Sequence, residues 1–230
     1  MKTSYCKKNS FSLRYICKQS EFTDDFKLIL NNPDAFCKEN VMKEDHTFTT
    51  TVAKVRANDK LFVIKRYNIK GFNHGIKRSF QPTRAARCWH YAHILKKLNI
   101  KTPEPVAMIE KRFGPLRREA YFITEYIEGP DGHTAFIDEP ADDITTEERA
   151  NKTIALLMQL RANNIYHGDL KSTNFVYHNN VPYILDLDAM RQYPSHKKAI
   201  RKLTKDKNRF LLNWQELDAK KYFEKLERLT

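Results

Sequence analysis

The stretch IYHGDLKSTNFVY, residues 165–177, decides how the rest of this chain is interpreted. Apolar residues flank a short polar segment that contains His167, Asp169, Lys171 and Asn174. A helical pattern precedes the segment and a strand pattern follows it, so we expect these four side chains in a tight loop between the two elements. The stretch therefore predicts a loop that presents several chemically active groups at once.

A second stretch, PYILDLDAM (182–190), adds an acid at the end of a pattern typical of a buried strand. Asn174 offers a neutral oxygen and Asp186 an anionic oxygen, both of which suit Mg²⁺. Asp169 can accept a proton from an attacking hydroxyl, or orient that hydroxyl. Lys171 can neutralise the charge of a phosphoryl group in transfer. The two stretches together therefore have the chemistry of phosphoryl transfer.

Lys65 supplies the remaining part of such a site. It lies in the middle of LFVIKRY (61–67), which reads as an apolar strand. A charged side chain on a buried strand costs free energy unless it is paired, and the α- and β-phosphates of a nucleotide would pair with it. Phosphoryl transfer uses a phosphate-binding lysine, oxygen ligands for Mg²⁺ and a carboxylate that positions the hydroxyl. The residues therefore predict an enzyme that uses ATP and Mg²⁺.

Length and composition agree with a folded enzyme. The 230 residues are 41% hydrophobic and 12% aromatic, which is enough for a sizeable core in one domain or two lobes. Because no apolar run approaches ~18 residues, we expect no membrane-spanning helix. The N-terminal residues have no pattern of a secretory signal, and the four cysteines form no CxxC pair, so free thiols in the cytosol are expected.

The net charge of +13 favours a polyanionic partner, since 41 Lys and Arg face 28 Asp and Glu. Nucleic acid, anionic lipid and a phosphorylated substrate all fit, as does a surface that is merely solvated. Two segments, 111–118 and 197–210, concentrate the positive charge. A nucleic-acid-binding module would bind in a steeply salt-dependent way. The chain has no aromatic RNA-binding motif and no zinc-finger spacing, so we expect no nucleic-acid partner.

The order of the elements predicts two lobes, 1–128 and 129–230. Residues 1–40 have no readable pattern. A helix is expected after Gly129, with a capping box formed by Thr145 and Glu148 and an end at Asn163 and Asn164. The other expected elements are a hairpin over 47–56 and 61–67, a helix over 83–98, strands at 105–110 and 120–127 around a basic loop at 111–118, a short hairpin over 174–188 and a basic helical tail.

Several motifs resemble those of kinases. HGDLKSTN resembles the protein-kinase catalytic loop H-R-D-L-K-x-x-N, with Gly168 in place of Arg. FVIK resembles the strand-three lysine motif V-A-I-K, and DLD stands where D-F-G would stand. Together with VIKRYN, TRAARCWHYAHILKKLNIKTPEPVAMIE and ILDLDAMR, these motifs resemble the bacterial lipopolysaccharide core kinases over roughly residues 45–215. No A-P-E follows DLDAMRQYP, which favours this family over protein kinases.

The resemblance implies an α+β fold of the protein-kinase-like bilobal kind, with a small antiparallel β-rich N-lobe and a reduced helical C-lobe. It implies ATP-dependent phosphorylation of a sugar hydroxyl, of heptose or Kdo, in the lipopolysaccharide inner core. An atypical kinase of the same fold that acts on protein or on another small molecule is the alternative. The implied partners are the core glycolipid and the anionic inner membrane, with the enzyme peripheral on the cytoplasmic face.

The resemblance also implies a role for each site residue. Asp169 and Lys171 would be catalytic, Asn174 and Asp186 would hold Mg²⁺, and Lys65 would bind the phosphates of ATP. ITEYIEG resembles the inter-lobe hinge, so the backbone of Glu125 and Ile127 would bind the adenine edge.

This sequence departs from the kinase pattern at two places. No glycine-rich loop precedes Lys65, so residues 43–52 are expected to cover the phosphates by other contacts. The helix over 83–98 contains no Asp or Glu, so Glu104 or Asp188 would pair with Lys65, or that ion pair is absent. Asp188, in the glycine position of D-F-G, is expected to be a further metal ligand or a capping group.

Two further residues are expected to support the loop. Asp206 would brace the loop from below, as an internal acid does in kinase folds. We expect His167 to pack and bond to the backbone and not to catalyse.

Overall fold

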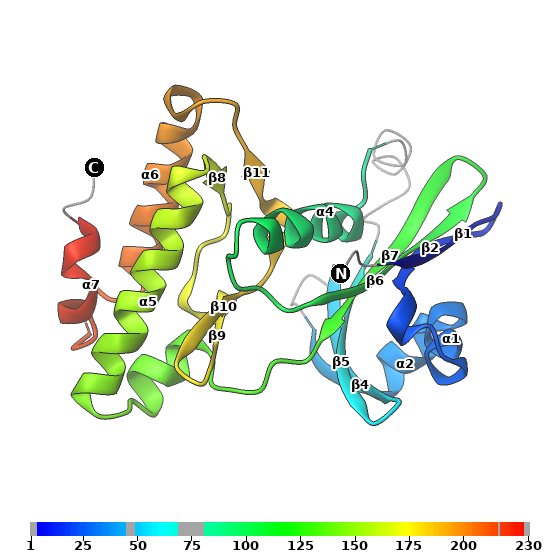
Figure 1. Ribbon diagram of the computed structural model, residues 1–230, viewed down its shortest axis with the longest axis horizontal. Coiled ribbons are helices and arrows are strands. Elements are labelled where there is room, and N and C mark those ends of the chain that lie inside the picture. The colour runs from blue at the N-terminus through cyan, green and yellow to red at the C-terminus, as the bar shows by residue number, and fades with distance from the viewer. Residues whose placement is uncertain (1–3, 45–48, 69–80, 216, 228–230) are drawn as a thin grey trace. The chain divides into compact units, whose positions relative to one another are not determined.

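The computed structural model describes residues 4–44, 49–68, 81–215 and 217–227 (Figure 1). Residues 45–48 lie outside the described part, and with them the first two residues of the predicted strand 47–56 and part of the segment expected to cover the phosphates. The chain divides into two compact units. One comprises Met1–His93 and Glu104–Tyr126, and the other comprises Ile94–Pro103 and Ile127–Thr230. The domain boundary expected after residue 128 stays a prediction.

A seven-stranded antiparallel sheet forms the centre of the first unit, in the order β1-β2-β6-β7-β5-β4-β3. The expected hairpin of β4 and β5 is confirmed, and Asn58 and Asp59 turn it with positive φ angles that these two residue types tolerate. The strands are β1 (Tyr5–Asn9), β2 (Leu13–Lys18), β3 (Val41–Glu44), β4 (Thr50–Ala57), β5 (Lys60–Tyr67), β6 (Pro105–Phe113) and β7 (Leu116–Glu125).

The basic segment 111–118 is not the loop that the sequence predicts. Strand β6 continues to Phe113 and β7 begins at Leu116, which leaves only a tight turn between them. The reason lies in the N-terminal residues, because β2 pairs with β6 as far as Leu13 opposite Lys111. Because β6 pairs with β2 as well as with β7, its backbone keeps hydrogen-bonding partners further along its length.

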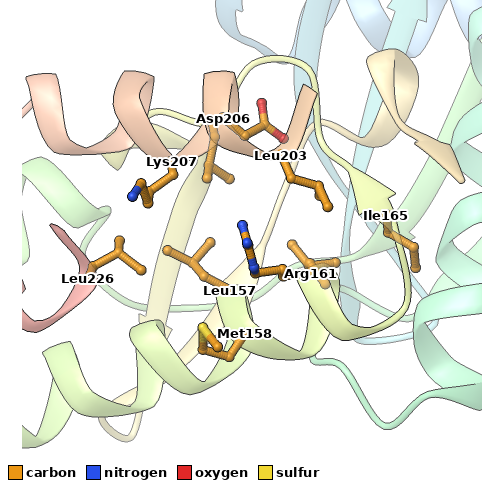
Figure 2. Close-up of a pocket in the computed structure, with 10 residues that line it drawn as sticks. Leu157, Met158, Arg161, Ile165, Leu203, Asp206, Lys207 and Leu226 are labelled. Carbon is orange, nitrogen blue, oxygen red and sulfur yellow. The ribbon is translucent and has the colours of Figure 1, made fainter. Parts of the chain in front are cut away.

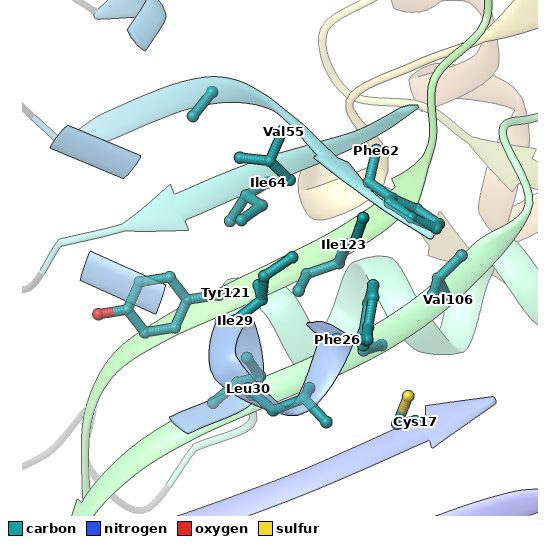
Figure 3. Close-up of a cluster of buried hydrophobic side chains, with 14 of the residues drawn as sticks. Cys17, Phe26, Ile29, Leu30, Val55, Phe62, Ile64, Val106, Tyr121 and Ile123 are labelled. Carbon is teal, nitrogen blue, oxygen red and sulfur yellow. The ribbon is translucent and has the colours of Figure 1, made fainter. Parts of the chain in front are cut away.

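Helices α1 (Asp24–Asn31) and α2 (Pro33–Glu39) cover one face of this sheet and complete its core (Figure 3). The side-chain oxygen of Thr23 caps α1 by accepting a hydrogen bond from the N–H of Phe26. Phe26, Ile29 and Leu30 of α1 are fully buried against side chains of β4 to β7. Residues 5–39, which have no readable pattern as sequence, therefore supply two strands and two helices of the first unit.

Helix α4 (Arg84–Lys97) confirms the helix expected over 83–98. The hydroxyl of Tyr67 lies 3.1 Å from Sγ of Cys88 on α4, and the guanidinium of Arg84 lies over the Tyr67 ring. Successive residues of a strand point to opposite faces, so Lys65 and Tyr67 share the face that α4 contacts. Phe62 and Ile64 of the same strand point instead into the core beneath α1.

The second unit is mostly helical. Its core contains an aromatic cluster in which the rings of Trp214 and Phe223 stack with centroids 4.7 Å apart and Phe210 packs edge-on against both. The predicted short hairpin is confirmed by β9 and β10. The elements are η2 (Thr134–Asp138), α5 (Asp143–Ala162), β8 (Ile165–Tyr166), η3 (Ser172–Asn174), β9 (Phe175–His178), β10 (Val181–Ile184), η4 (Leu187–Ala189), β11 (Arg191–Gln192), α6 (His196–Leu212) and α7 (Lys220–Glu227).

Helix α5 begins earlier than the predicted capping box. Asp142 is its N-cap, and a side-chain oxygen of Asp142 accepts a hydrogen bond from the N–H of Thr145 at 3.0 Å. Thr145 itself lies inside the first turn, so the box of Thr145 and Glu148 is wrong. Aspartate caps a helix as well as threonine does, and here it occurs first along the chain.

The four cysteines are free thiols, as expected. Cys17, Cys37 and Cys88 are buried, whereas Cys6 is partly exposed. Among the described helices, none combines the length and the apolar character needed to cross a bilayer.

Candidate active site

A carboxylate from α6 holds the loop that follows α5 and β8. The backbone N–H of His167 donates to Oδ2 of Asp206 at 2.6 Å, and the N–H of Gly168 donates to Oδ1 of the same carboxylate at 3.1 Å. Two consecutive amides therefore bind one side chain from 38 residues further along the chain. The predicted brace at Asp206 is confirmed.

Asp206 makes these contacts in a buried environment of mostly apolar side chains, with Arg161 and Lys207 also lining the pocket. Its side chain is only 6% exposed and lines a small pocket of about 40 Å³ between α5, α6 and α7 (Figure 2). Burial raises the pKa of Asp206, and the opposing effects of the His167 and Gly168 contacts are smaller. The sequence holds a signal for this burial, because Asp206 falls in the apolar stripe of α6 formed by Ala199, Leu203 and Phe210.

His167 has a structural role, as the sequence predicts. The residue is fully buried, and its Nδ1 accepts a hydrogen bond from the N–H of Asp169 at 3.3 Å. The proton is therefore on Nε2, which donates to the carbonyl oxygen of Leu185 at 2.8 Å. The imidazole thus connects the loop to the strand end that precedes Asp186.

Gly168 is required by the shape of the loop. Its φ angle is +94°, and a Cβ atom on it would lie 2.8 Å from Cβ of Ala189 and 3.0 Å from the Ala189 carbonyl oxygen. A side chain at this position would clash with the segment after Asp186. This close approach explains why glycine stands where the kinase loop has arginine.

Asp169 is held by cations on both carboxylate oxygens. Its Oδ2 lies 3.1 Å from Nζ of Lys171, and its Oδ1 lies 2.5 Å from Nη2 of Arg209 on α6. The Asp169 side chain is 29% exposed, so it can reach a substrate while it keeps a fixed orientation. Sequence reasoning missed Arg209. The available signal was its position three residues after Asp206, which places both on one face of α6.

Asn174 and the segment before Asp186 are bonded to the same loop. Nδ2 of Asn174 donates to the carbonyl oxygen of Asp169 at 2.7 Å, which orients the amide and leaves Oδ1 as the ligand atom. The N–H of Leu185 donates to the carbonyl oxygen of Asn174 at 2.8 Å. Asp186 follows with a φ angle of +58°, and its Oδ1 is buried. Such a backbone angle is uncommon outside glycine and often occurs at functional sites.

The oxygen atoms of Asn174 and Asp186 fit a magnesium ion bound together with phosphates. Mg²⁺ in nucleotide sites takes one or two carboxylates from the protein and completes its shell with phosphate oxygens and water. Within residues 4–44, 49–68, 81–215 and 217–227, no three or more His, Cys, Asp or Glu side chains gather as a metal site of their own. The Mg²⁺ roles of Asn174 and Asp186 stay predictions.

Lys65 belongs to the first unit. It lies between Val52 of β4 and Phe122 of β7, and its Nζ is 5.6 Å from the centroid of the Tyr67 ring. Glu104, considered as a partner of Lys65, forms an ion pair of 3.1 Å with Lys18. Asp188, the other acid considered, is buried in the second unit. The acidic partner expected for Lys65 stays a prediction. The role of Asp188 as a metal ligand or capping group also stays a prediction.

Two backbone N–H groups near the expected hinge already donate hydrogen bonds to neighbouring segments of the first unit. The N–H of Glu125 donates to the carbonyl oxygen of Glu104 at 3.0 Å, and the N–H of Tyr126 donates to that of Leu61 at 2.9 Å. A backbone contact between Glu125 and a base would therefore involve its carbonyl oxygen. The adenine contacts of Glu125 and Ile127 stay predictions.

Comparison with known proteins agrees with the kinase motifs. A sequence model described as "Lipopolysaccharide kinase (Kdo/WaaP) family" matches residues 37–224. A solved structure, "WaaP in complex with acyl carrier protein", superposes with a TM-score of 0.62 at 15% identity, over 88% of this chain and 86% of that chain. No curated protein sequence matches. The expected α+β, kinase-like fold is confirmed by this likeness.

Proposed function

Because the chain belongs to the lipopolysaccharide kinase (Kdo/WaaP) family, we propose that it transfers the γ-phosphoryl group of ATP to a heptose or Kdo hydroxyl of the lipopolysaccharide inner core. Membership of the family makes the chain a phosphotransferase. The single observation that carries the finer proposal is the held carboxylate of Asp169, bound to Lys171 and Arg209 at its two oxygens. A carboxylate fixed in this way can receive a proton from an incoming alcohol.

The residues of the second unit would act on the acceptor. Asp169 orients the sugar hydroxyl and accepts its proton as the oxygen attacks phosphorus. Lys171, 44% exposed, stands beside Asp169 and offers positive charge to the phosphoryl oxygens during transfer. Arg209 fixes the orientation of the Asp169 carboxylate from α6. Asp206 keeps the loop backbone in place beneath them.

The remaining residues would bind the nucleotide. Lys65 binds the α- and β-phosphates of ATP, and the backbone of Glu125 and Ile127 binds the adenine edge. Asn174 and Asp186 would hold Mg²⁺, which when bound neutralises phosphate charge. Asn174 is already oriented for this by its hydrogen bond to the Asp169 carbonyl oxygen.

The proposed acceptor also sets the proposed location. An inner-core sugar is linked to a lipid, so the enzyme would work as a peripheral protein at the cytoplasmic face of the inner membrane. The net charge of +13 supports contact with an anionic surface. Exposed Lys and Arg residues of α6, among them Lys197, Lys198 and Arg201, would contribute to this attraction.

The test is phosphate transfer from labelled ATP with Mg²⁺ to dephosphorylated lipopolysaccharide core. Wild type should label the glycolipid, and Asp169→Asn should reduce the rate by about a thousandfold or more because the proton acceptor is lost. Asp218→Asn, which changes an exposed acid before α7, is the matched control and should keep the wild-type rate.

Two other results would redirect the proposal. Transfer to a peptide, to the protein itself or to a free sugar, without transfer to the core, would favour the alternative kinase of the same fold. If ATP binds and Lys65→Ala abolishes that binding while no acceptor is labelled, then the nucleotide site stands and the acceptor assignment fails.

A further inference from the structure

The hairpin of β1 and β2 and the hairpin of β6 and β7 end side by side in the first unit (Figure 1). Each end carries an exposed aromatic ring. Phe11, in the turn between β1 and β2, is 64% exposed, and Phe113, at the end of β6, is 63% exposed. The ring centroids are 5.0 Å apart with an interplanar angle of 73°, which is an edge-to-face contact. The two rings therefore form one exposed apolar surface and are not isolated side chains.

The backbone holds this aromatic pair in position. The N–H of Arg112 donates to the carbonyl oxygen of Ser12 at 2.8 Å, and the N–H of Gly114 donates to that of Phe11 at 2.9 Å. Gly114 has a φ angle of +58°, and a Cβ atom there would lie 3.1 Å from the Phe11 ring. The turn thus needs glycine both for its backbone angle and for the approach of the ring. These contacts order the exposed rings before any partner arrives.

Basic residues are concentrated in the two segments that carry the rings. Residues 7–14 contain three Lys or Arg and residues 111–118 contain four, and neither segment contains an Asp or Glu. Lys7 and Lys8 on β1 and Arg118 on β7 are exposed, and Arg118 also forms an ion pair of 3.9 Å with Glu119. Ordered aromatic side chains among exposed basic groups match the boundary between acyl chains and anionic headgroups of a lipid bilayer.

We propose that Phe11 and Phe113, with Lys7, Lys8 and Arg118, form a membrane-docking surface for anionic lipid. The two rings insert at the level of the headgroups, and the three basic side chains bind lipid phosphates. This inference rests on the proposed function, since a lipid-linked acceptor brings the enzyme to a bilayer. It also goes beyond the family match, which begins at residue 37 and so does not include Phe11, Lys7 or Lys8.

The experiment measures co-sedimentation of the full chain with phosphatidylcholine vesicles that contain phosphatidylglycerol, or with phosphatidylcholine alone. Wild type should bind the anionic vesicles, less strongly at high salt, and bind phosphatidylcholine weakly. The double variant Phe11→Ser and Phe113→Ser should lose about tenfold in vesicle affinity because two inserted rings are removed. Leu28→Ser, which removes a 62% exposed apolar side chain on α1, is the matched control and should bind as wild type.

Two outcomes would overturn the docking surface. One is equal binding of wild type and the double variant to anionic vesicles, or no binding by either. The other is a concentration-dependent increase in mass by ultracentrifugation that the double variant abolishes, because the rings would then join two copies of this chain.

Activity on a delipidated, water-soluble core oligosaccharide separates this inference from the proposed function. The double variant should phosphorylate the soluble acceptor at the wild-type rate, because its changes lie outside the residues assigned to catalysis. Phosphorylation by wild type without vesicle binding would defeat the docking surface alone. Vesicle binding that depends on both rings, without phosphorylation, would support the docking surface and defeat the proposed function.

Discussion

Each unit contains a carboxylate that joins segments far apart in the sequence, but the two carboxylates have opposite kinds of partner. In the first unit, Asp34 of α2 accepts hydrogen bonds from Arg66 of β5 at 2.7 Å and from the hydroxyl of Tyr121 of β7 at 2.6 Å. It also forms an ion pair with Lys111 of β6. In the second unit, the partners of Asp206 include two backbone amides of the loop that contains Asp169. Asp34 is therefore paired mainly with charged side chains, whereas Asp206 is paired mainly with the dipoles of backbone amides.

The difference appears in the direction of their pKa shifts. Burial acts to raise the pKa of Asp34, but the hydrogen bonds from Lys111, Tyr121 and Arg66 outweigh it and lower the pKa to about 2. Burial prevails at Asp206 and raises its pKa. Asp34 therefore stabilises the folded chain at neutral pH. The raised pKa of Asp206 means that ionising its carboxyl group costs stability in the folded chain, and what Asp206 contributes is the position of the loop.

Of the substitutions that test this contrast, Asp206→Asn should have the largest effect, and that effect should be on activity. An asparagine oxygen can replace one carboxylate oxygen, but its NH₂ group cannot accept the second amide hydrogen bond. The loop shifts as a result, and a shift of about 1 Å costs on the order of a hundredfold in the transfer rate. Steady-state kinetics with core acceptor would measure this loss. An undiminished rate would mean that the brace does not position Asp169.

Asp34→Asn should act on stability instead. Neutralising an acid whose pKa is lowered to about 2 removes about 2 kcal/mol from the free energy of unfolding at neutral pH. Urea unfolding measures that change, and activity below the transition should stay within about twofold of wild type. The control Asp59→Asn changes an exposed turn residue with φ +59°, which asparagine adopts readily. If Asp34→Asn lost as much activity as Asp206→Asn, the assignment of Asp34 to stability and of Asp206 to the position of the loop would be wrong.

Arg209→Ala should reduce the catalytic rate by about tenfold, because its side chain is 46% exposed and water partly replaces the ion pair with Asp169. The KM for ATP should not change, since the contact is to Asp169 and not to the residues assigned to the nucleotide. Arg209→Lys should restore part of the rate. Equal losses in the alanine and lysine variants would show that packing, and not charge, is what α6 provides here.

The smallest and sharpest test is the pH dependence of unfolding. The folded pKa of Asp34 is lowered, so its stabilisation is complete above the unfolded value of about 4 and is lost as the pH falls toward about 2. Wild type and Asp34→Asn should therefore converge in stability over that range. The folded pKa of Asp206 is raised, so wild type should lose stability relative to Asp206→Asn as the pH rises above about 4. Parallel curves for all three proteins would contradict both assignments.

Local patterns in the sequence were sufficient for several helices and hairpins. The hairpin of β4 and β5, helix α4 and the hairpin of β9 and β10 follow from periodicity and turn residues over short windows. The buried acid in the stripe of α6 marks Asp206 in the same way. Each of these patterns lies within one short, continuous stretch of sequence.

The features that could not be predicted depend on distant partners. Asp34 meets Lys111 and Tyr121 across 77 and 87 residues, and no local pattern encodes such contacts. Strand β2 is recognisable as a strand mainly through its pairing with β6, and β1 through its pairing with β2. The same pairing extends β6 through the basic segment that reads as a loop. Arg209 lies 40 residues from Asp169, and although it shares a face of α6 with Asp206, nothing local marks it as the partner of Asp169.

The thiols of this chain offer a route to site-specific chemical labelling. Burial raises the pKa of Cys17 to about 12 and that of Cys37 to about 11, and Cys88 of α4 is buried with its Sγ 3.1 Å from the Tyr67 hydroxyl. Thiolates are the reactive species toward maleimides, so these three positions resist modification in the folded protein. Cys6 is partly exposed on β1, one residue from Lys7. A polarity-sensitive dye attached there, without any engineered cysteine, would report on the docking surface in the otherwise native protein.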